Sequence, residues 1–591
     1  MGTQHSQRWV LLAGYALCAV AFPGSLWASN AYLVRNLTSD VPDLADYTDP
    51  NLKGAWGISE SGKSPFWISD AGSGVSTLYT SVGSVIPLVV TIPPSKAAKT
   101  GTPTGTVYNG TLGFVIPKEG PATFIFDTLD GTISGWNKNV SAAQVVVDKS
   151  ASGAVYTGLA IGTSGANTYL YAANFGNGTI DVFDTAYNPV TLPNAFQDNN
   201  LPASYAPFNI QNLAGNLYVA YALQSNSKSF AVPGAGNGYV DVYSPAGTLM
   251  QRLVKSVYLN APWGLAIAPT NFGDYASDLL VGNFGDGTIN VFNPVTGAYI
   301  ATLNDVIGTP IVIPGLWALQ AGNGGSGGDA NAIYFTAAIP GPDTGTHGLL
   351  GRLQAAPIVS SSNVVNAASY QPALAPNTWV AITGGNLSGT ERLWNDGDFV
   401  NGALPTDIDF VSVTVNGTHA YVEYVSPTQL NVLLPAGLAT GLAQLRTYNF
   451  GLASTAVTVL VQEVAPAFFL QSDGTHVVAT HADGSLIGPT GTTGATPAAP
   501  GETIVLYGTG FGVTNPAAPD GKLIKAPLPL ATPPTITIGG TAGHVTFAGL
   551  TYAGLFQINV TIPTSTASGD APVVALVGSS VSPSGAVIAI Q

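Results

Sequence analysis

Alternating apolar and polar positions, interrupted by glycine-rich turns, recur along the first half of the chain. Each copy reads as a strand, a turn that contains glycine and a second strand, which is the pattern of a β-hairpin. The clearest copies are Phe124–Asn137, Tyr171–Asp184 and Leu280–Asn293. Looser copies at Phe66–Tyr79, Leu217–Tyr243 and Ile333–Leu353 bring the number of predicted hairpins to six.

Further strands flank most of these hairpins. Short apolar strands rich in small residues precede four of them, at Ala55–Ile58, Thr157–Ile161, Pro262–Ile267 and Gly315–Leu319. A fourth strand follows at least three, at Leu88–Ile92, Gln144–Val147 and Ala298–Leu303. Four strands repeated about every 50 residues predict a six-bladed β-propeller over residues 32–354. The glycines of the innermost strands are expected to let the six backbones converge at the axis.

The last hairpin has no fourth strand of its own, because the chain leaves this region after Leu353. The segment Tyr32–Asn36 is the candidate for that strand. Such a closure would join the two ends of the propeller and cover both sheet edges.

A second repeat occupies the rest of the chain. Ala375–Leu387 is similar to Ala499–Phe511 and Gln429–Pro435 is similar to Gln557–Pro563, at offsets of 124 and 128 residues. Both copies are runs of short alternating strands, which predict two antiparallel β-sandwiches over residues 355–464 and 465–591. The amides of Gln429 and Asn431 are expected to face outward or to bond to neighbouring backbone.

Both halves resemble known families. The pattern of Pro376–Leu387 and Gln429–Pro435, with its second copy, resembles Ig-like (IPT/TIG-type) C-terminal domains of secreted bacterial proteins. The propeller region resembles an uncharacterised family of exported bacterial proteins with a six-bladed, NHL-like propeller, on the segments Asn36–Asp40, Thr48–Leu52, Ala55–Ser59 and Trp67–Asp70. The expected fold class is therefore all-β: a six-bladed β-propeller followed by two Ig-like β-sandwich domains. These resemblances imply export and supply no catalytic residues.

The N-terminus carries a predicted secretory signal peptide, residues 1–31. Arg8 precedes the apolar run Trp9–Phe22, and Pro23 and Gly24 follow it. The run is shorter than the roughly twenty residues of a membrane span, so we expect no transmembrane span in the mature chain. The lone cysteine, Cys18, lies inside this segment. The mature protein is therefore expected to be secreted or extracytoplasmic (periplasmic, cell-surface or extracellular) without disulfides.

Composition narrows the function classes. Charged residues are 8% of the chain. The sequence contains 17 Lys and Arg and 32 Asp and Glu, which gives a formal net charge of −15. Because no basic run is present to neutralise phosphates, the sequence argues against nucleic acid as a partner.

Polar residues recur at the end of the predicted second strands. In a propeller the ends of the second strands and the beginnings of the first strands lie on one face, so these side chains would ring one mouth of the channel. Oxygen ligands that converge from several blades would suit Ca²⁺, and gluconolactonase-like propellers hold an axial metal in this general way. Alternatively, Asp and Asn begin the tight hairpin turns. The candidate residues are Asp70, Asp127, Asn174 and Asn283, with the aromatics Trp56, Trp263 and Trp317 close to the inner strands.

An acidic cluster belongs to the same face. Asp40, Asp43, Asp46 and Asp49 lie within ten residues, and Asp46 and Asp49 are the candidates for a cation site beside the mouth. A solvated acidic loop is the alternative. His347 is either a base or ligand on this face or an exposed turn residue.

One segment matches the letters of a hydrolase motif, but its surroundings do not fit a catalytic site. Gly324–Gly328 matches G-x-S-x-G but sits in a glycine tract between two strands, whereas a nucleophile elbow needs a strand before it and a helix after it. We expect a flexible loop there. The sequence contains no Cys/His cluster for a zinc or haem site.

Three functions fit these features. The first is an exported binding or scaffold protein, whose propeller face recognises a cell-envelope, glycan or protein partner and whose Ig-like pair acts as a spacer or docking module. The alternative is a metal-dependent hydrolase or lactonase with its site at the channel mouth. The third is a structural component of a surface layer. No Glu or His recurs among the mouth residues to act as a base, which favours a binding protein over an enzyme.

Overall fold

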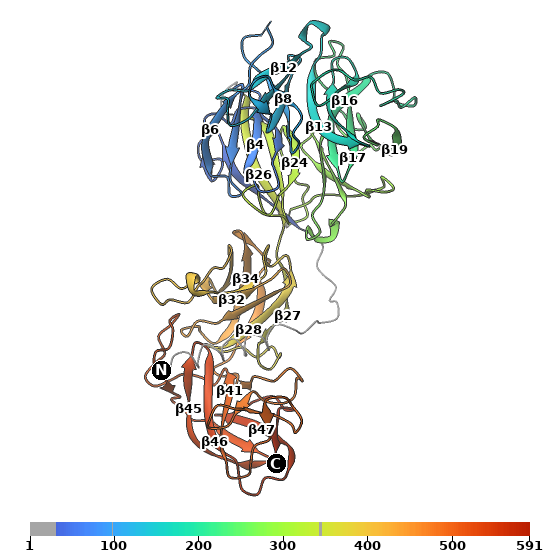
Figure 1. Cartoon of the computed structure of the whole chain (residues 1–591). Helices are drawn as coiled ribbons and strands as arrows, with labels where there is room; N and C mark the ends of the chain where they lie inside the picture. The colour runs from blue at the N-terminus through green and yellow to red at the C-terminus, as the bar shows by residue number, and fades with distance from the viewer. Residues whose placement is uncertain (1–30, 97, 306, 342–345) are drawn as a thin grey trace. The chain divides into compact units, whose positions relative to one another are not determined.

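The computed structural model describes residues 31–96, 98–305, 307–341 and 346–591. The chain divides into two compact units, Ser29–Ala355 and Ala356–Gln591, both built from strands (Figure 1). In the described part of the chain, helix is limited to three short 3₁₀ turns: η1 (Ser150–Ser152), η2 (Gly273–Tyr275) and η3 (Asp396–Asp398). The predicted signal peptide lies almost wholly outside the described residues.

The first unit contains six large sheets, antiparallel except for the pairing of β1 with β2, which are the blades of a β-propeller. From the axis outward, blade 1 contains β3 (Ala55–Ser59), β4 (Phe66–Asp70), β5 (Val75–Tyr79) and β6 (Val85–Thr91). Blade 2 contains β7 (Pro103–Tyr108), β10 (Phe124–Thr128), β11 (Thr132–Trp136) and β12 (Gln144–Asp148), with the small hairpin β8 (Val115–Ile116) and β9 (Gly120–Pro121) inserted. Blade 3 has three strands, β13 (Tyr156–Ser164), β14 (Asn167–Asn174) and β15 (Thr179–Phe183).

The remaining blades follow the same order. Blade 4 contains β16 (Tyr205–Leu213), β17 (Asn216–Leu223), β18 (Gly238–Tyr243) and β19 (Leu249–Val254). Blade 5 contains β20 (Pro262–Ile267), β21 (Leu279–Asn283), β22 (Ile289–Phe292) and β23 (Tyr299–Thr302). Blade 6 contains β24 (Leu316–Ala321), β25 (Ile333–Pro340) and β26 (Thr346–Ala355), and then β1 (Tyr32–Ser39) and β2 (Tyr47–Thr48) from the beginning of the unit.

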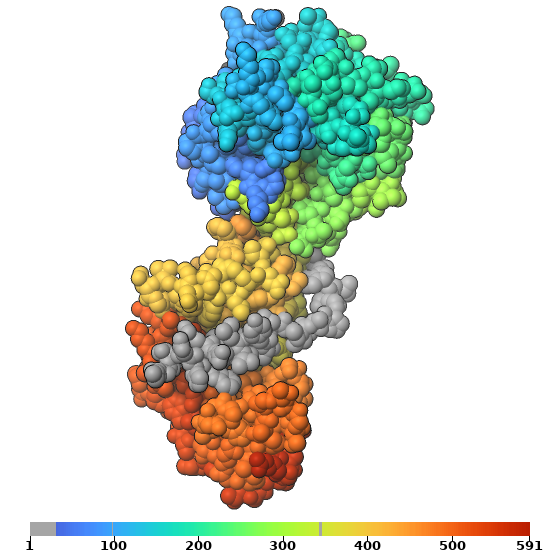
Figure 2. Space-filling view, in the orientation of Figure 1, coloured from blue at the N-terminus to red at the C-terminus, as the bar shows by residue number. Residues whose placement is uncertain are grey.

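The N-terminal strand closes the ring, as the sequence predicts. β1 pairs antiparallel with β26, with Tyr32 opposite Ala355 and Arg35 opposite Arg352. The innermost strands also contact one another in sequence around the axis, and β24 contacts β3. Figure 2 shows the blue N-terminal atoms beside yellow-green atoms of the last blade.

Glycines allow the inner strands to approach closely. A β-carbon on Gly57 would overlap the carbonyl oxygen of Thr104 in blade 2, and one on Gly158 would overlap the side chain of Asn209 in blade 4. These positions have ordinary backbone conformations. Space at the axis, rather than a special dihedral, therefore requires the glycines.

The second unit contains two sandwiches whose main strands correspond. In the first sandwich one sheet has the order β27-β28-β33-β32-β29, and the other pairs β30 with β31 and β34, which also pairs with β35 and β36. These strands are β27 (Ile358–Asn366), β28 (Trp379–Gly385), β29 (Arg392–Leu393), β30 (Val411–Val415), β31 (Thr418–His419), β32 (Tyr421–Val425), β33 (Gln429–Leu433), β34 (Gly441–Asn449), β35 (Leu452–Ala453) and β36 (Val457–Val461).

The second sandwich repeats both sheets. In one sheet, the order β28-β33-β32-β29 of the first sandwich corresponds to β41-β46-β45-β42. In the other, β47 pairs with β43, β48 and β49, just as β34 pairs with β30, β35 and β36. Its strands are β37 (Ala467–Phe468), β38 (Ala479–Thr480), β39 (Leu486–Ile487), β40 (Ala495–Thr496), β41 (Thr503–Thr509), β42 (Leu528–Pro529), β43 (Thr535–Ile538), β44 (Thr541–Ala542), β45 (His544–Tyr552), β46 (Leu555–Thr561), β47 (Gly569–Val577), β48 (Ser580–Val581) and β49 (Val587–Ile590). The sequence repeat therefore corresponds to equivalent strands.

The expectation that Asn431 faces outward or bonds to backbone is wrong. Its side chain is fully buried, and its Oδ1 accepts a hydrogen bond of 2.9 Å from Gln429 Nε2. Residues two apart on a strand share a face, so the two amides lie close enough to bond to each other. The same bond, 2.8 Å long, joins Gln557 and Asn559 in the second copy.

Candidate functional site

The strand register defines two ends of the propeller channel. Asp70, at the end of β4, lies opposite Ala55 at the beginning of β3, and Asn283 at the end of β21 lies opposite Pro262 at the beginning of β20. We call this end the entry mouth, because each inner strand begins there. The inner strands end at the opposite, exit mouth.

Aromatic rings meet near the entry mouth. Trp56 and Trp317 stack with centroids 3.5 Å apart, and Phe284 stacks on Trp317 at 4.2 Å. Trp263 meets Trp317 edge-on at 6.0 Å, and its indole nitrogen donates to the Thr157 carbonyl at 2.8 Å. The three tryptophans singled out in the sequence therefore come together from blades 1, 5 and 6, and they fill space at the axis.

The two predicted aspartates are held inside their own blades. Asp70 is fully buried and accepts a hydrogen bond of 2.8 Å from Thr77. Asp127 is fully buried and accepts from Thr104 Oγ1 at 2.7 Å and from the Gly105 amide at 2.5 Å. Burial raises the pKa of Asp70 well above its ordinary value and the pKa of Asp127 to about 6. Asp70 thus joins the two strands of its own hairpin, whereas Asp127 joins β10 to the inner strand β7.

The two predicted asparagines behave in the same way. Asn174 Oδ1 accepts from the Val155 amide at 3.2 Å, and Asn283 Oδ1 accepts from the Asn260 amide at 3.0 Å. Asn283 Nδ2 donates to the Tyr258 carbonyl at 2.8 Å. Each amide therefore joins the end of a second strand to the segment that leads into the inner strand.

The acidic cluster is split between the surface and the interior. Asp46 forms an exposed ion pair of 2.8 Å with Arg35, whereas Asp49 is buried and accepts from Tyr79 Oη at 2.9 Å. Asp40 pairs with His347 Nδ1 at 2.8 Å. Among the described residues, no group of three or more His, Cys, Asp or Glu side chains is arranged to hold a metal ion. The Ca²⁺ site at the entry mouth stays a prediction.

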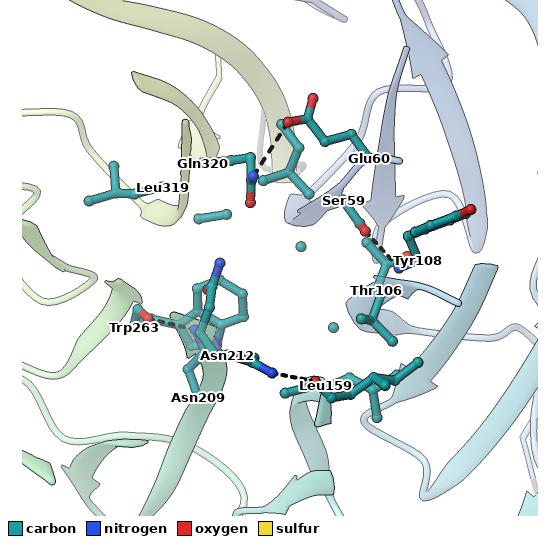
Figure 3. A pocket seen from close by; sticks show the side chains of 18 residues that line it. Ser59, Glu60, Thr106, Tyr108, Leu159, Asn209, Asn212, Trp263, Leu319 and Gln320 are labelled. Atoms are coloured by element: carbon teal, nitrogen blue, oxygen red, sulfur yellow. Dashed lines mark hydrogen bonds between the residues drawn. The ribbon is translucent and has the colours of Figure 1, made fainter. Parts of the chain in front are cut away.

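A pocket of about 230 Å³ opens on the axis toward the exit mouth (Figure 3). All six inner strands contribute to its wall, and its polar side chains come from the exit ends of those strands. The polar lining residues are Ser59, Glu60, Thr106, Tyr108, Asn209, Gln211, Asn212 and Gln320.

Some of these polar groups are already occupied by the fold. Asn209 Nδ2 donates to the Trp263 carbonyl and Asn212 Nδ2 to the Ile161 carbonyl, both at 2.8 Å. Within the part of the chain that the structure describes, Thr106 Oγ1 and Glu60 Oε2 are buried without a hydrogen-bond partner. Thr106 lies in the wall of the pocket, whereas Glu60 Oε2 is covered by the loop that contains Gly327.

Glu60 is the single Asp, Glu, Lys, Arg or His among the residues of this wall. Burial raises its pKa to about 9, against a weaker opposing effect of its hydrogen bond from Gln320 Nε2 at 3.5 Å. At neutral pH the carboxyl is therefore protonated, and the pocket carries no net charge.

The glycine tract explains how Glu60 is covered. Gly324–Gly328 lies in the loop between β24 and β25, as expected, and Asn323 Nδ2 ties this loop to the Ser61 and Ser64 carbonyls at 2.8 and 3.0 Å. A β-carbon on Gly327 would overlap Glu60 Oε2. The tract thus packs its backbone onto a pocket carboxyl.

Sequence reasoning missed the pocket residues. Glu60, Gln211 and Gln320 are polar positions at the ends of strands that are otherwise apolar, and this recurrence was the available signal. The prediction concentrated on the hairpin turns at the entry mouth, where Asp and Asn have a local structural role.

Comparisons with known proteins identify relatives that are described as uncharacterized. No family model matches the chain. Two proteins of Acanthamoeba polyphaga mimivirus are similar: uncharacterized protein R648 is 33% identical over 341 residues, which cover 55% of this chain and 80% of the relative. Uncharacterized protein L690 is 32% identical over 339 residues, 55% of this chain and 85% of the relative. The chain belongs to the family of these proteins.

Solved structures give a weaker likeness. A streptogramin B lyase structure is 10% identical and covers 56% of this chain and all of its own, with a TM-score of 0.34. A glucose dehydrogenase is 12% identical, covers 54% of this chain and 98% of its own, and has a TM-score of 0.35. Similarity at this level says nothing about activity. The propeller is assigned from the sheet order of the chain itself.

Proposed function

We propose that this protein is an exported extracytoplasmic or cell-surface binding protein, whose NHL-like propeller holds a small neutral polar ligand in the axial pocket. The Ig-like pair would act as a spacer or docking module. The observation that carries the proposal is the pocket itself: four of the six blades direct uncharged hydrogen-bonding side chains at one space, and two of these groups lack partners.

The chemistry of the wall favours a hydroxyl-rich ligand, such as a sugar or the end of a glycan. Buried donors and acceptors discriminate strongly for ligands that satisfy them. A charged ligand would find no counter-ion in a pocket whose single ionisable group is protonated. At about 230 Å³ the pocket is smaller than most ligand sites, which favours a monosaccharide over a larger molecule. Within the described residues, no helix has the length and apolarity to cross a membrane.

The proposal is tested by titrating the full chain with glucose, galactose, mannose and N-acetylglucosamine. Calorimetry and saturation-transfer NMR measure the binding. We expect at least one sugar to bind, and Thr106→Val to weaken that binding at least fivefold. Thr458→Val, which changes an exposed strand threonine of the first sandwich, is the matched control. Binding should also weaken as pH rises through about 9. If no neutral sugar binds, or if both valine variants bind alike, the proposal is wrong.

A further inference from the structure

Blade 3 lacks a fourth strand. Among the sheets of the described propeller it alone stops at three, and its outer edge is β15. The chain begins a fourth strand beyond β15, because Phe183 forms a bridge with Pro189 and the Val190 amide donates to the Val182 carbonyl at 2.8 Å. It then leaves the sheet, and the pairing ends after one bridge.

Because the chain leaves the sheet here, backbone amide and carbonyl groups on the outer side of β15 have no neighbouring strand to pair with. The bond from Val190 shows that the backbone groups of Val182 point away from β14. Residues two apart along a strand direct their backbone groups to the same side, so Ile180 also points its amide and carbonyl outward. Neither group has a backbone partner among the described residues. An edge of this kind is a template for another strand.

Cavities adjoin the open edge. One, of about 430 Å³, follows β15 from Thr179 to Phe183 and is walled on its other side by Pro189–Leu192. A second, of about 340 Å³, adjoins Asn177–Ile180 on the side of blade 4, whose Tyr205 and Tyr221 line it. Side chains alternate between the two faces of a strand, so a strand added beside β15 would find room for them.

Charge favours an acidic occupant. Lys149 lines the first cavity and Lys228 the second, in a chain with only 17 Lys and Arg. The acidic side chains nearby are already bound: Asp181 accepts from Tyr156 Oη at 2.8 Å, and Asp198 pairs with Arg252. The Arg252 guanidinium thus neutralises Asp198, whereas Asp181 keeps its charge among uncharged partners. The two lysines leave the pair of cavities with a net positive charge.

We propose that the open edge of β15 binds an extended acidic peptide segment of a partner protein, which adds to blade 3 as its fourth strand. Backbone hydrogen bonds to Ile180 supply affinity, and the two cavities select the alternate side chains, as in other cases of β-strand addition. Acidic residues of the segment lie near Lys149 and Lys228. This surface is separate from the axial pocket, so the inference does not depend on the proposed ligand.

A random nine-residue peptide library displayed on phage, selected on the full chain, provides the probe. We expect enriched peptides with alternating β-branched residues and Asp or Glu. Ile180→Pro removes the outward amide without removing a β14–β15 hydrogen bond, and should lower the affinity of the recovered peptide at least tenfold in fluorescence anisotropy. An unchanged melting temperature would show that this variant is folded.

A second variant keeps the test independent of proline. Lys149→Glu with Lys228→Glu should also weaken binding at least tenfold, whereas Lys138→Glu, an exposed lysine of blade 2, should not. Three results would overturn the proposal. Selection on the wild-type chain could enrich nothing over selection on Ile180→Pro, or the recovered peptides could be basic. The third is that the double variant Lys149→Glu, Lys228→Glu binds the peptide as tightly as wild type does. Dimerisation of the wild-type chain that Ile180→Pro abolishes, measured by analytical ultracentrifugation, would assign the edge to self-association and overturn the proposal as well.

Discussion

Glu60 Oε2 occupies the space that a β-carbon on residue 327 would need. Gly327 is thus required by packing against a pocket carboxyl, although it belongs to a loop and has no left-handed backbone conformation. Gly327→Ala should displace Glu60 or the loop and cost about 1–3 kcal/mol of unfolding free energy, the usual cost of overpacking. Gly62→Ala has no heavy atom within 4 Å of the new methyl group and should change the free energy of unfolding by less than about 0.5 kcal/mol. Urea unfolding measures both, and equal values would contradict the contact.

The stability of the propeller should depend on pH through Glu60. Its pKa rises from 4.5 to about 9 on folding, so between these values the unfolded chain has released the proton and the folded chain has kept it. Unfolding free energy therefore falls as pH rises through this window, by up to about 1.4 kcal/mol per pH unit. Glu60→Gln removes this contribution. The difference in stability between wild type and Glu60→Gln should change steadily from pH 5 to pH 8, and parallel profiles would refute the burial of a protonated carboxyl.

Ring closure should depend on Tyr32. Its side chain is fully buried, and its hydroxyl donates to the Phe272 carbonyl at 2.7 Å. Tyr32→Ala should cost about 3–5 kcal/mol, as for other large buried side chains, and Tyr32→Phe about 1 kcal/mol for the lost hydrogen bond. Thermal unfolding of the full chain checks the order, with Tyr47→Ala, which removes a half-exposed ring from β2, as the control. If another segment closed the ring, all three variants would have similar unfolding temperatures, and this result would contradict the prediction.

Calcium tests the entry mouth. Because Asp70 and Asp127 are each bonded within a blade, we expect millimolar calcium to shift the melting temperature of wild type and of the Asp70→Asn, Asp127→Asn double variant equally. Metal analysis of the purified chain, followed by melts with and without chelator, provides the measurement. A calcium-dependent rise that is lost in the double variant would establish the cation site and revive the metal-dependent hydrolase.

The stability of the second sandwich should also fall as pH rises, through one histidine. Burial alone would lower the pKa of His476, but hydrogen bonds with Asp570 at 3.1 Å and Asp473 at 2.6 Å outweigh it and raise the pKa. The stabilisation is therefore complete below the ordinary histidine pKa and is lost as pH rises through the folded value. His476→Asn should destabilise more at pH 5.5 than at pH 8.5, by about 0.5–1 kcal/mol because the carboxylates are partly exposed. Urea unfolding at the two pH values measures the difference, and equal destabilisation at both would contradict it.

Much of the architecture follows from local pattern. Each hairpin is specified by alternation over a few residues and a glycine turn, so Tyr171–Asp184 and Leu280–Asn293 were readable without knowledge of their neighbours. The match between Gln429–Leu433 and Gln557–Thr561 is likewise local. Ring closure was also predictable, because a blade that lacks a strand and an unpaired strand at the other end of the unit complement each other.

The candidate site required the tertiary structure. Glu60, Thr106 and Gln320 are isolated polar residues in sequence, and only the convergence of inner strands from three blades places them around one pocket. Asp70 and Asp127 show the converse, since their recurrence in sequence reflects blades that each need a buried acceptor between neighbouring strands. Local periodicity determines the strands because it depends on neighbours in the chain. Which polar groups remain without partners depends on the whole ring, and so the tertiary structure alone decides it.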